Sequence, residues 1–177
     1  MTPNFGQDYF SLFGAARTWR LDEPALDRAY HDLQSQVHPD RYAHLSDTER
    51  RLSMQWATRV NEAYRTLRNP LTRARYLLEL HGADMKGESN TTMSAEFLME
   101  QMEWREAVES AREADDVEEL EKLWQRVRHQ TQDMYAGLER ELDVEHNHHA
   151  AAERVRRLMF MEKLRHEIEE AIEALEE

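Results

Sequence analysis

Apolar side chains recur at three- and four-residue spacing along most of this chain, and no stretch alternates convincingly at a spacing of two. Three- and four-residue spacing places apolar groups on one face of an α-helix, whereas a half-buried strand needs alternation. Leu158, Met161, Leu164 and Ile168 follow the helical spacing over several turns. We therefore expect an all-α fold without a sheet.

The first part of the chain has the pattern of a helical hairpin. A helix opening at Asp22 must end near His38, because Pro39 disfavours a helical residue before it. Ser46 and Glu49 have the spacing of a capping box, which predicts the start of a second helix. The expected buried faces are Leu26, Tyr30, Leu33 and Val37 on the first helix, and Leu52, Trp56, Val60, Ala63, Tyr64 and Leu67 on the second.

Shorter segments complete this part of the chain. The second helix ends at Asn69-Pro70, and a further helix is expected over residues 71–80. The tip of the hairpin is the loop formed by residues 38–45. The apolar piece at residues 9–14 is too small to stand alone and should pack across the hairpin.

The last part of the chain is expected to form an antiparallel bundle of three helices, at about residues 95–114, 116–142 and 148–176. Each helix carries an apolar seam at three- and four-residue spacing. The seam is Val117, Leu120, Trp124, Val127, Thr131, Met134 and Leu138 on the middle helix, and Leu158, Met161, Leu164, Ile168, Ala171 and Leu175 on the last.

Charge divides the chain near Gly82. Residues 1–81 hold 11 Lys and Arg against 10 Asp and Glu, whereas residues 82–177 hold 12 against 26. The stretch from Gly82 to Thr92 is polar and contains two glycines, so we expect an N-terminal domain at 1–81, a linker at 82–93 and a bundle at 94–177. The formal net charge of −13 excludes a general polyanion binder, because such a surface repels phosphate backbones and anionic lipid.

Several classes of protein are excluded by what the chain lacks. It has no cysteine, which excludes a disulfide scaffold, a thiolate metal site and a catalytic thiol. No apolar run approaches the roughly 20 residues of a membrane span, and residues 1–20 lack the pattern of a secretory signal. No phosphate loop, nucleophile elbow or paired catalytic carboxylate is visible. We expect a cytoplasmic protein that is not an enzyme and holds no cofactor.

The tip of the hairpin carries His38-Pro39-Asp40, followed by Arg41. Pro-Asp alone would serve as a turn. The tripeptide, however, follows the segment 8–14 (DYFSLFG) and precedes 61–70 (NEAYRTLRNP) at a spacing that extends over some 70 residues. This set resembles a J-domain, the module by which co-chaperones stimulate the ATPase of a DnaK-type chaperone.

A second feature lies on the helix beginning near Ser94. Phe97, Trp104, Val108 and Ala111 share one face, which suffices for a place in the bundle. Leu98, Met99 and Met102 fall 100° to 200° away, on the side of Glu103 and Glu106. Helix crossing could widen the buried stripe to include them. The alternative is an exposed apolar patch with a carboxylate rim, suited to docking a protein.

Three segments extend the resemblance along nearly the whole chain, namely 69–82 (NPLTRARYLLELHG), 97–103 (FLMEQME) and 157–165 (RLMFMEKLR). Together they resemble the HscB family, the J-type co-chaperones of iron–sulfur cluster biogenesis. In that family the J-domain engages the specialised chaperone HscA, and the C-terminal bundle binds the cluster scaffold IscU, which aids cluster transfer.

The resemblance also implies site residues. Those implied for the chaperone are His38, Pro39, Asp40, Arg41 and Arg28, and those for the scaffold are Leu98, Met99, Met102, Glu103, Glu106 and Phe160. The chain departs from the family at two places. Gln34-Ser35-Gln36 stands where J-domains usually have basic residues, so either docking depends less on charge, or Arg50 and Arg51 compensate, or the matching chaperone carries less charge. Ser110 stands where a carboxylate is expected, so that edge of the interface is either weaker or supplied by Glu109.

Two alternatives stay open. The cluster Glu145-His146-Asn147-His148-His149 could bind a divalent ion, although adjacent positions on a starting helix point in different directions. We expect an interhelix turn there and no metal. The acidic bundle could instead bind unfolded clients or another folded partner, as in a general J-domain co-chaperone. The chain is expected to be a monomer.

Overall fold

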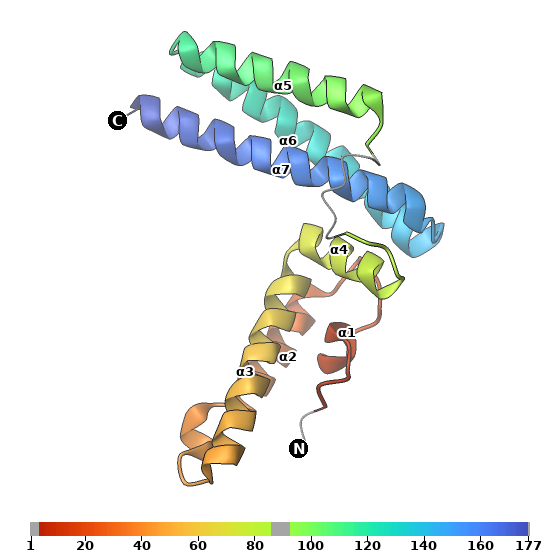
Figure 1. Ribbon diagram of the computed structural model, residues 1–177, viewed down its shortest axis with the longest axis vertical. Coiled ribbons are helices and arrows are strands. Elements are labelled where there is room, and N and C mark those ends of the chain that lie inside the picture. The colour runs from red at the N-terminus through yellow and green to blue at the C-terminus, as the bar shows by residue number, and fades with distance from the viewer. Residues whose placement is uncertain (1–3, 86–92, 177) are drawn as a thin grey trace. The chain divides into compact units, whose positions relative to one another are not determined.

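The computed structural model describes residues 4–85 and 93–176, and the described residues form helices and turns without a strand (Figure 1). The all-α fold predicted from the sequence is confirmed. The chain divides into two compact units, Met1–Leu77 and Leu78–Glu177. The predicted linker at 82–93 lies largely outside the described residues, and the division falls earlier, within α4 (Pro70–Leu80). Residues after Leu77 belong to the second unit, where His81 stacks on His148.

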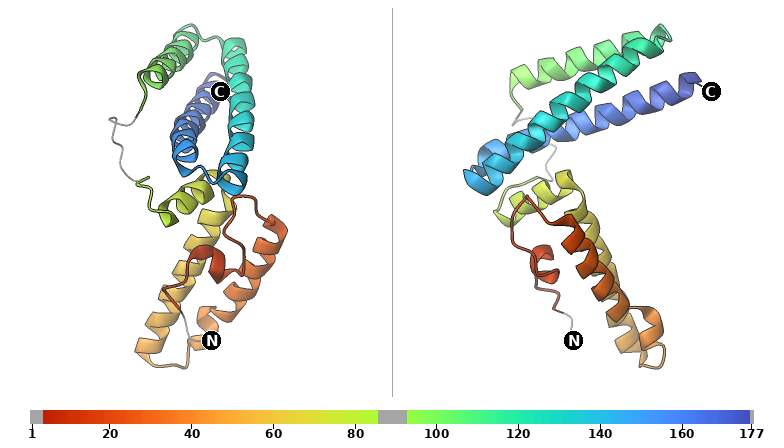
Figure 2. Two further views of the ribbon diagram at one scale, coloured as in Figure 1. Left: turned by 90° about the vertical axis from the view of Figure 1, so that its right-hand side faces the viewer. Right: turned by 180° about the vertical axis from the view of Figure 1, so that it is seen from behind.

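The first unit is built on an antiparallel hairpin of α2 (Glu23–Gln36) and α3 (Asp47–Arg68) (Figures 1 and 2). Both predicted helix starts are confirmed: the Asp22 side chain caps α2, and Ser46 with Glu49 forms the capping box of α3. Two tyrosines join the helices. The rings of Tyr30 and Tyr64 stack at 3.9 Å, and their hydroxyls donate hydrogen bonds to Asn61 and Asp27, each at 2.8 Å.

The short helix α1 (Tyr9–Leu12) packs across the hairpin, as its length predicts. Phe10 is fully buried, and the Tyr9 ring stacks on Tyr76 of α4 at 4.5 Å. The backbone N–H of Tyr9 donates to the Tyr76 hydroxyl at 2.9 Å. These contacts fix the segment before the hairpin against the helix after it, so the hairpin is supported along one side.

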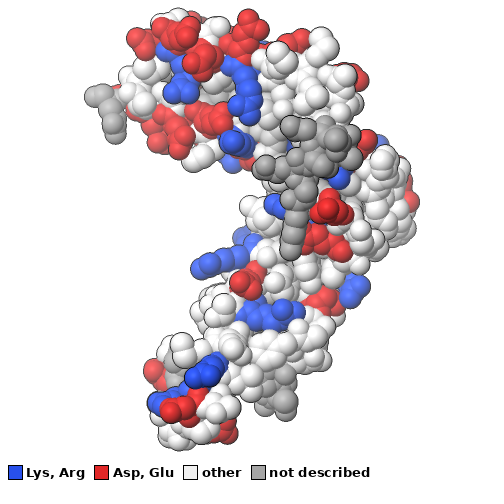
Figure 3. All heavy atoms as spheres, viewed as in Figure 1, with Lys and Arg blue, Asp and Glu red and all other residues white. Residues whose placement is uncertain are grey.

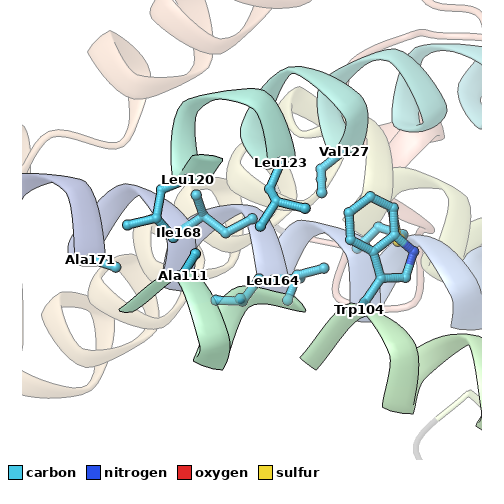
Figure 4. Packing of buried hydrophobic residues seen from close by; sticks show 10 residues of the cluster. Trp104, Ala111, Leu120, Leu123, Val127, Leu164, Ile168 and Ala171 are labelled. Carbon is cyan, nitrogen blue, oxygen red and sulfur yellow. The ribbon is translucent and has the colours of Figure 1, made fainter. Parts of the chain in front are cut away.

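The second unit is an antiparallel bundle of α5 (Ala95–Glu113), α6 (Val117–Glu139) and α7 (His148–Glu176). Side chains of all three helices interdigitate in its core (Figure 4). They include Trp104 and Ala111 of α5, Leu120 and Leu123 of α6, and Leu164 of α7. Polar side chains reinforce the α6–α7 contact, since the Trp124 indole donates to Glu169 at 2.9 Å. The expected three-helix bundle is therefore confirmed.

The predicted buried faces differ from the structure at several positions, and Tyr30, Leu33, Tyr64, Val117 and Met134 are only partly buried. Leu52 is 42% exposed in the first turns of α3, where it lines a hollow beside the tip loop. Leu175 is 36% exposed in the last turn of α7. Leu123 was missed and is buried, whereas the predicted Trp124 is only partly buried. The buried stripe of α6 is wider than strict three-four spacing because α6 packs against two helices.

One buried ion pair holds the α6–α7 turn. A π-helical turn, Arg140–Val144, continues α6 and buries Glu141. Both carboxylate oxygens of Glu141 accept from Arg154 of α7, at 2.8 and 2.9 Å. Gly137 makes room for this guanidinium, since a Cβ atom there would lie 2.6 Å from Arg154 Cζ. Truncating one partner of such a pair costs more than the pair contributes, because it leaves a buried charge.

We expect Arg154→Met to lower the free energy of unfolding by about 3 kcal/mol, since Met fills much of the volume but leaves the Glu141 carboxylate buried without its cation. Adding Glu141→Leu should restore most of that loss. Urea unfolding followed by circular dichroism measures the effect, and hydrogen exchange of α6 and α7 localises it. Equal stability of the single and double variants would contradict a charge-based explanation.

Candidate functional site

The hairpin tip is a structured loop rather than a free turn. Val37, the C-cap residue that follows α2, is buried against Trp56 and Val60 of α3. Pro39 begins a 3₁₀ turn, Pro39–Tyr42, and the residue before it, His38, caps that turn. The His38 Nδ1 atom accepts from the Asp40 backbone N–H at 3.3 Å, and the His38 carbonyl accepts from the Arg41 N–H at 3.0 Å. The three residues His38, Pro39 and Asp40 therefore occupy one defined turn.

Two further hydrogen bonds close the loop at its ends. The Tyr42 hydroxyl donates to the carbonyl of Gln36 at 2.7 Å, which ties the loop to the last residue of α2. The Leu45 N–H donates to the carbonyl of Tyr42 at 3.0 Å, directly before the Ser46 capping box. A loop held at both ends loses less conformational entropy when it binds a partner.

The polar side chains of this turn point into solvent. The side chains of His38 and Asp40 are 57% and 92% exposed, and His38 Nδ1 lies 3.5 Å from Asp40 Oδ2. One nitrogen cannot serve both contacts, because accepting from the Asp40 N–H needs the Nδ1 lone pair, whereas an ion pair needs a proton there. While His38 keeps its backbone bond, the Asp40 carboxylate stays available to a cation on a partner.

The basic residues implied for this surface are spread along both helices. Arg41 is exposed within the 3₁₀ turn, and Arg28 is exposed on α2, roughly 12 Å along the helix axis from Gln36. Of the two residues that could compensate for Gln34-Ser35-Gln36, Arg50 is paired with Asp47. Exposed Arg51 is therefore the better candidate to supply positive charge beside the tip.

A hollow beside the tip was missed at the sequence level. It encloses about 360 Å³ between the 3₁₀ turn and the start of α3, and its lining includes Arg41, Tyr42, Leu45, Leu52 and Trp56. Leu52 was assigned to the core, which hid this feature. The exposed Asp40 carboxylate and a partly apolar hollow are therefore both found at the tip of the hairpin.

The second candidate surface lies on α5 and is exposed. Leu98, Met99 and Met102 are 38%, 63% and 70% exposed, while Phe97 and Trp104 of the same helix are buried in the bundle. The prediction of an exposed apolar patch is confirmed, and the alternative of a widened buried stripe is wrong for these three residues. Glu103 and Glu106 are exposed beside them. Figure 3 shows Asp and Glu gathered over the bundle, with Lys and Arg between them.

Phe160 links this patch to α7. Its partly buried ring meets Phe97 edge-on, with ring centroids 5.9 Å apart, and the Arg105 guanidinium lies 5.6 Å from its centroid. Arg157 also contacts Phe97: its guanidinium lies 5.1 Å from the centroid of that ring and 3.6 Å from a carboxylate oxygen of Glu100. We call the set Leu98, Met99, Met102, Glu103, Glu106 and Phe160 the α5 patch.

The two arginines of this region were missed in the sequence. Arg105 and Arg157 act across helices, and a contact between α5 and α7 leaves no signal in the spacing along one helix. Ser110 and its neighbour Glu109 are both exposed, about one helical turn after Glu106. The rim of the α5 patch therefore carries both carboxylates and guanidinium groups. Such a rim favours a partner surface with opposite charges at the facing positions.

The histidine-rich turn before α7 has a different arrangement from a metal site. The His148 ring stacks on the His81 ring with centroids 4.1 Å apart. Burial lowers the pKa of His148, and the charges of His81 and His146 lower it further. Within residues 4–85 and 93–176, no three His, Asp or Glu side chains are placed to hold a metal ion.

Among the helices of the described residues, none combines the length and apolarity needed to span a membrane.

Comparison with known proteins gives consistent matches along the chain. The family model described as "HSCB C-terminal oligomerisation domain" matches residues 93–169. A protein of Aromatoleum aromaticum described as "Co-chaperone protein HscB homolog" is 61% identical over 176 residues, which cover 99% of each chain.

Two solved structures share the fold of the whole chain. Chaperone HscB from Vibrio cholerae superimposes with a TM-score of 0.84 at 36% identity, covering 96% of this chain and 99% of the other. Human co-chaperone protein HscB superimposes with a TM-score of 0.88 at 30% identity, covering 96% of this chain and 84% of the other.

Proposed function

Because the chain belongs to the HscB family of co-chaperones, we propose that it stimulates the ATPase of a DnaK-type chaperone of the HscA kind and delivers an IscU-type iron–sulfur scaffold to it. The observation that carries this proposal is the presence of two exposed surfaces in different compact units. The structured turn at His38 to Asp40 lies in Met1–Leu77, and the α5 patch lies in Leu78–Glu177. The two surfaces share no residue, so one chain can engage two partners.

The role proposed for the tip is differential binding. His38, Pro39 and Asp40, with Arg41 and Arg28, contact the nucleotide-binding domain of the chaperone in its hydrolysis-competent state. Asp40 accepts a charge-assisted hydrogen bond from a chaperone arginine. A partner shifts an equilibrium only by its difference in affinity for the two states, and a shift from 1:99 to 99:1 needs about 5.5 kcal/mol. Catalysis thus belongs to the chaperone.

The role proposed for the α5 patch is scaffold docking. Leu98, Met99 and Met102 supply exposed apolar area, which methionine can adapt to a partner because its side chain is unbranched. Glu103 and Glu106 orient a basic surface of the scaffold, and Phe160 extends the contact to α7. Since the chain has no cysteine, the cluster is held by thiolates of the scaffold.

The test is the steady-state ATPase rate of a purified HscA-type chaperone with the chain alone, with an IscU-type scaffold alone, and with both. We expect the rate with both to exceed the sum of the separate increases, because the chain joins the scaffold and the chaperone in one complex. An unfolded polypeptide in place of the scaffold is the control. If it stimulates equally and the scaffold adds nothing, the chain is a general J-domain co-chaperone.

A further inference from the structure

The methionines of the chain differ sharply in exposure. Met85 and Met161 are buried, and Met161 belongs to the core of the bundle. Among the described methionines, the three that are more than half exposed are Met54 at 64%, on α3, and Met99 and Met102 of the α5 patch. The last two are three residues apart on α5, so their side chains lie on neighbouring positions of one helix face.

This exposure makes the two thioethers accessible to oxidants. Methionine is converted to its sulfoxide by reactive oxygen species, and reductases specific for each epimer reverse the change. Cysteine thiolates, which would otherwise compete for oxidant within the same molecule, are absent from this chain. Exposed methionines are therefore the first sulfur atoms that an oxidant meets on its surface.

We propose that Met99 and Met102 form an oxidation site within the α5 patch, through which hydrogen peroxide or a hypohalous acid weakens docking of the scaffold. The proposal rests on the scaffold-binding function proposed above. In the step with peroxide, the lone pair of the thioether sulfur attacks one peroxide oxygen, so that an S–O bond forms while the O–O bond breaks, and the proton on the transferred oxygen passes to the departing hydroxide. The sulfur becomes a sulfoxide, oxidised by two electrons, and the peroxide is reduced to one molecule of water.

Oxidation should weaken docking because the sulfoxide is more polar than the thioether. A sulfoxide replaces a flexible apolar side chain by a polar, chiral one. Burying its oxygen without a hydrogen-bond partner costs free energy that the thioether does not cost. The change occurs at the most exposed apolar positions of α5, between Leu98 and the carboxylates of Glu103 and Glu106. A docked scaffold would cover the two thioethers and shield them from the oxidant, so it should slow the oxidation of both residues.

The experiment treats the purified full chain with hydrogen peroxide, removes the peroxide, and titrates untreated scaffold. Peptide mass spectrometry should show that Met54, Met99 and Met102 oxidise before Met85 and Met161. We expect the dissociation constant to rise about tenfold or more, equivalent to roughly 1.4 kcal/mol, and to return after treatment with methionine sulfoxide reductases. Oxidation in the presence of scaffold should slow at Met99 and Met102 relative to Met54.

Variants assign the effect to the two residues. For Met99→Leu with Met102→Leu, the affinity of the untreated variant is its own baseline, and peroxide should leave that affinity unchanged, because leucine is apolar and has no sulfur. Met54→Leu should stay as sensitive as the wild-type chain. Unchanged affinity of the oxidised chain, or a double variant that remains sensitive, would overturn the oxidation site alone. Absence of scaffold binding by the untreated chain would overturn the proposed function as well.

Discussion

Asp40→Asn is expected to abolish stimulation of the chaperone ATPase. The amide has the shape of the carboxylate but no charge, so it loses the charge-assisted hydrogen bond to a chaperone arginine. Removing one partner of such a bond at an interface costs about 2–5 kcal/mol, enough to reduce stimulation by more than tenfold at fixed concentration. His38→Gln should have the same effect, because it removes the imidazole that accepts from the Asp40 N–H.

The measurement is the single-turnover rate of ATP hydrolysis by the chaperone at rising concentrations of each variant. Asp32→Asn, an equally conservative change of an exposed α2 residue, serves as the matched control and should stimulate like the wild-type chain. The fold of the variant is not at risk, since the Asp40 side chain is 92% exposed. Scaffold affinity should be unchanged. Stimulation that survives either change would contradict the J-domain role of the tip.

The second large effect is expected at the α5 patch. Changing Leu98, Met99 and Met102 together to Ala should weaken scaffold binding by about 3 kcal/mol or more, a loss greater than 100-fold, because a few apolar anchors carry most of an interface's free energy. The helix should persist, since all three side chains are exposed and alanine has the highest helix propensity. ATPase stimulation by the chain alone should stay at the wild-type level.

Titration calorimetry with the scaffold measures the change, and a matched control is available elsewhere in the chain. Leu52, Met54 and Val144 are also exposed apolar residues, and none belongs to the α5 patch. Their joint replacement by Ala removes a similar apolar area and should leave scaffold affinity intact. Equal losses in the two triple variants would indicate a nonspecific apolar effect, and an undiminished affinity of the first would count against the patch.

Much of the fold could be predicted from the sequence because its signals are local. Helix starts at Asp22 and Ser46 depend on side chains that cap their own helix, and the exposed face of α5 follows from the angle between neighbouring positions. The prediction failed where a second element decides burial. Leu52 has an apolar spacing like that of its neighbours, but it lines an open hollow beside the tip loop and is not packed in a core.

For the candidate surfaces too, features within one helix could be predicted, whereas contacts between helices could not. The exposure of Leu98, Met99 and Met102 could be predicted, whereas the cations around the patch could not. Arg105 reaches the Phe160 ring, and Arg157 reaches Phe97, only because α5 and α7 cross at that point. The bidentate Glu141–Arg154 pair likewise depends on a π-helical turn, which no residue pattern in the sequence predicts.

Binding of a folded scaffold by α5 of the bundle can be measured by titrating an IscU-type scaffold into the wild-type chain. We expect saturable binding with a negative heat-capacity change, since apolar surface is buried, and we expect that an unfolded polypeptide does not compete. The contradicting result is a chain that ignores the folded scaffold while its bundle binds the unfolded polypeptide.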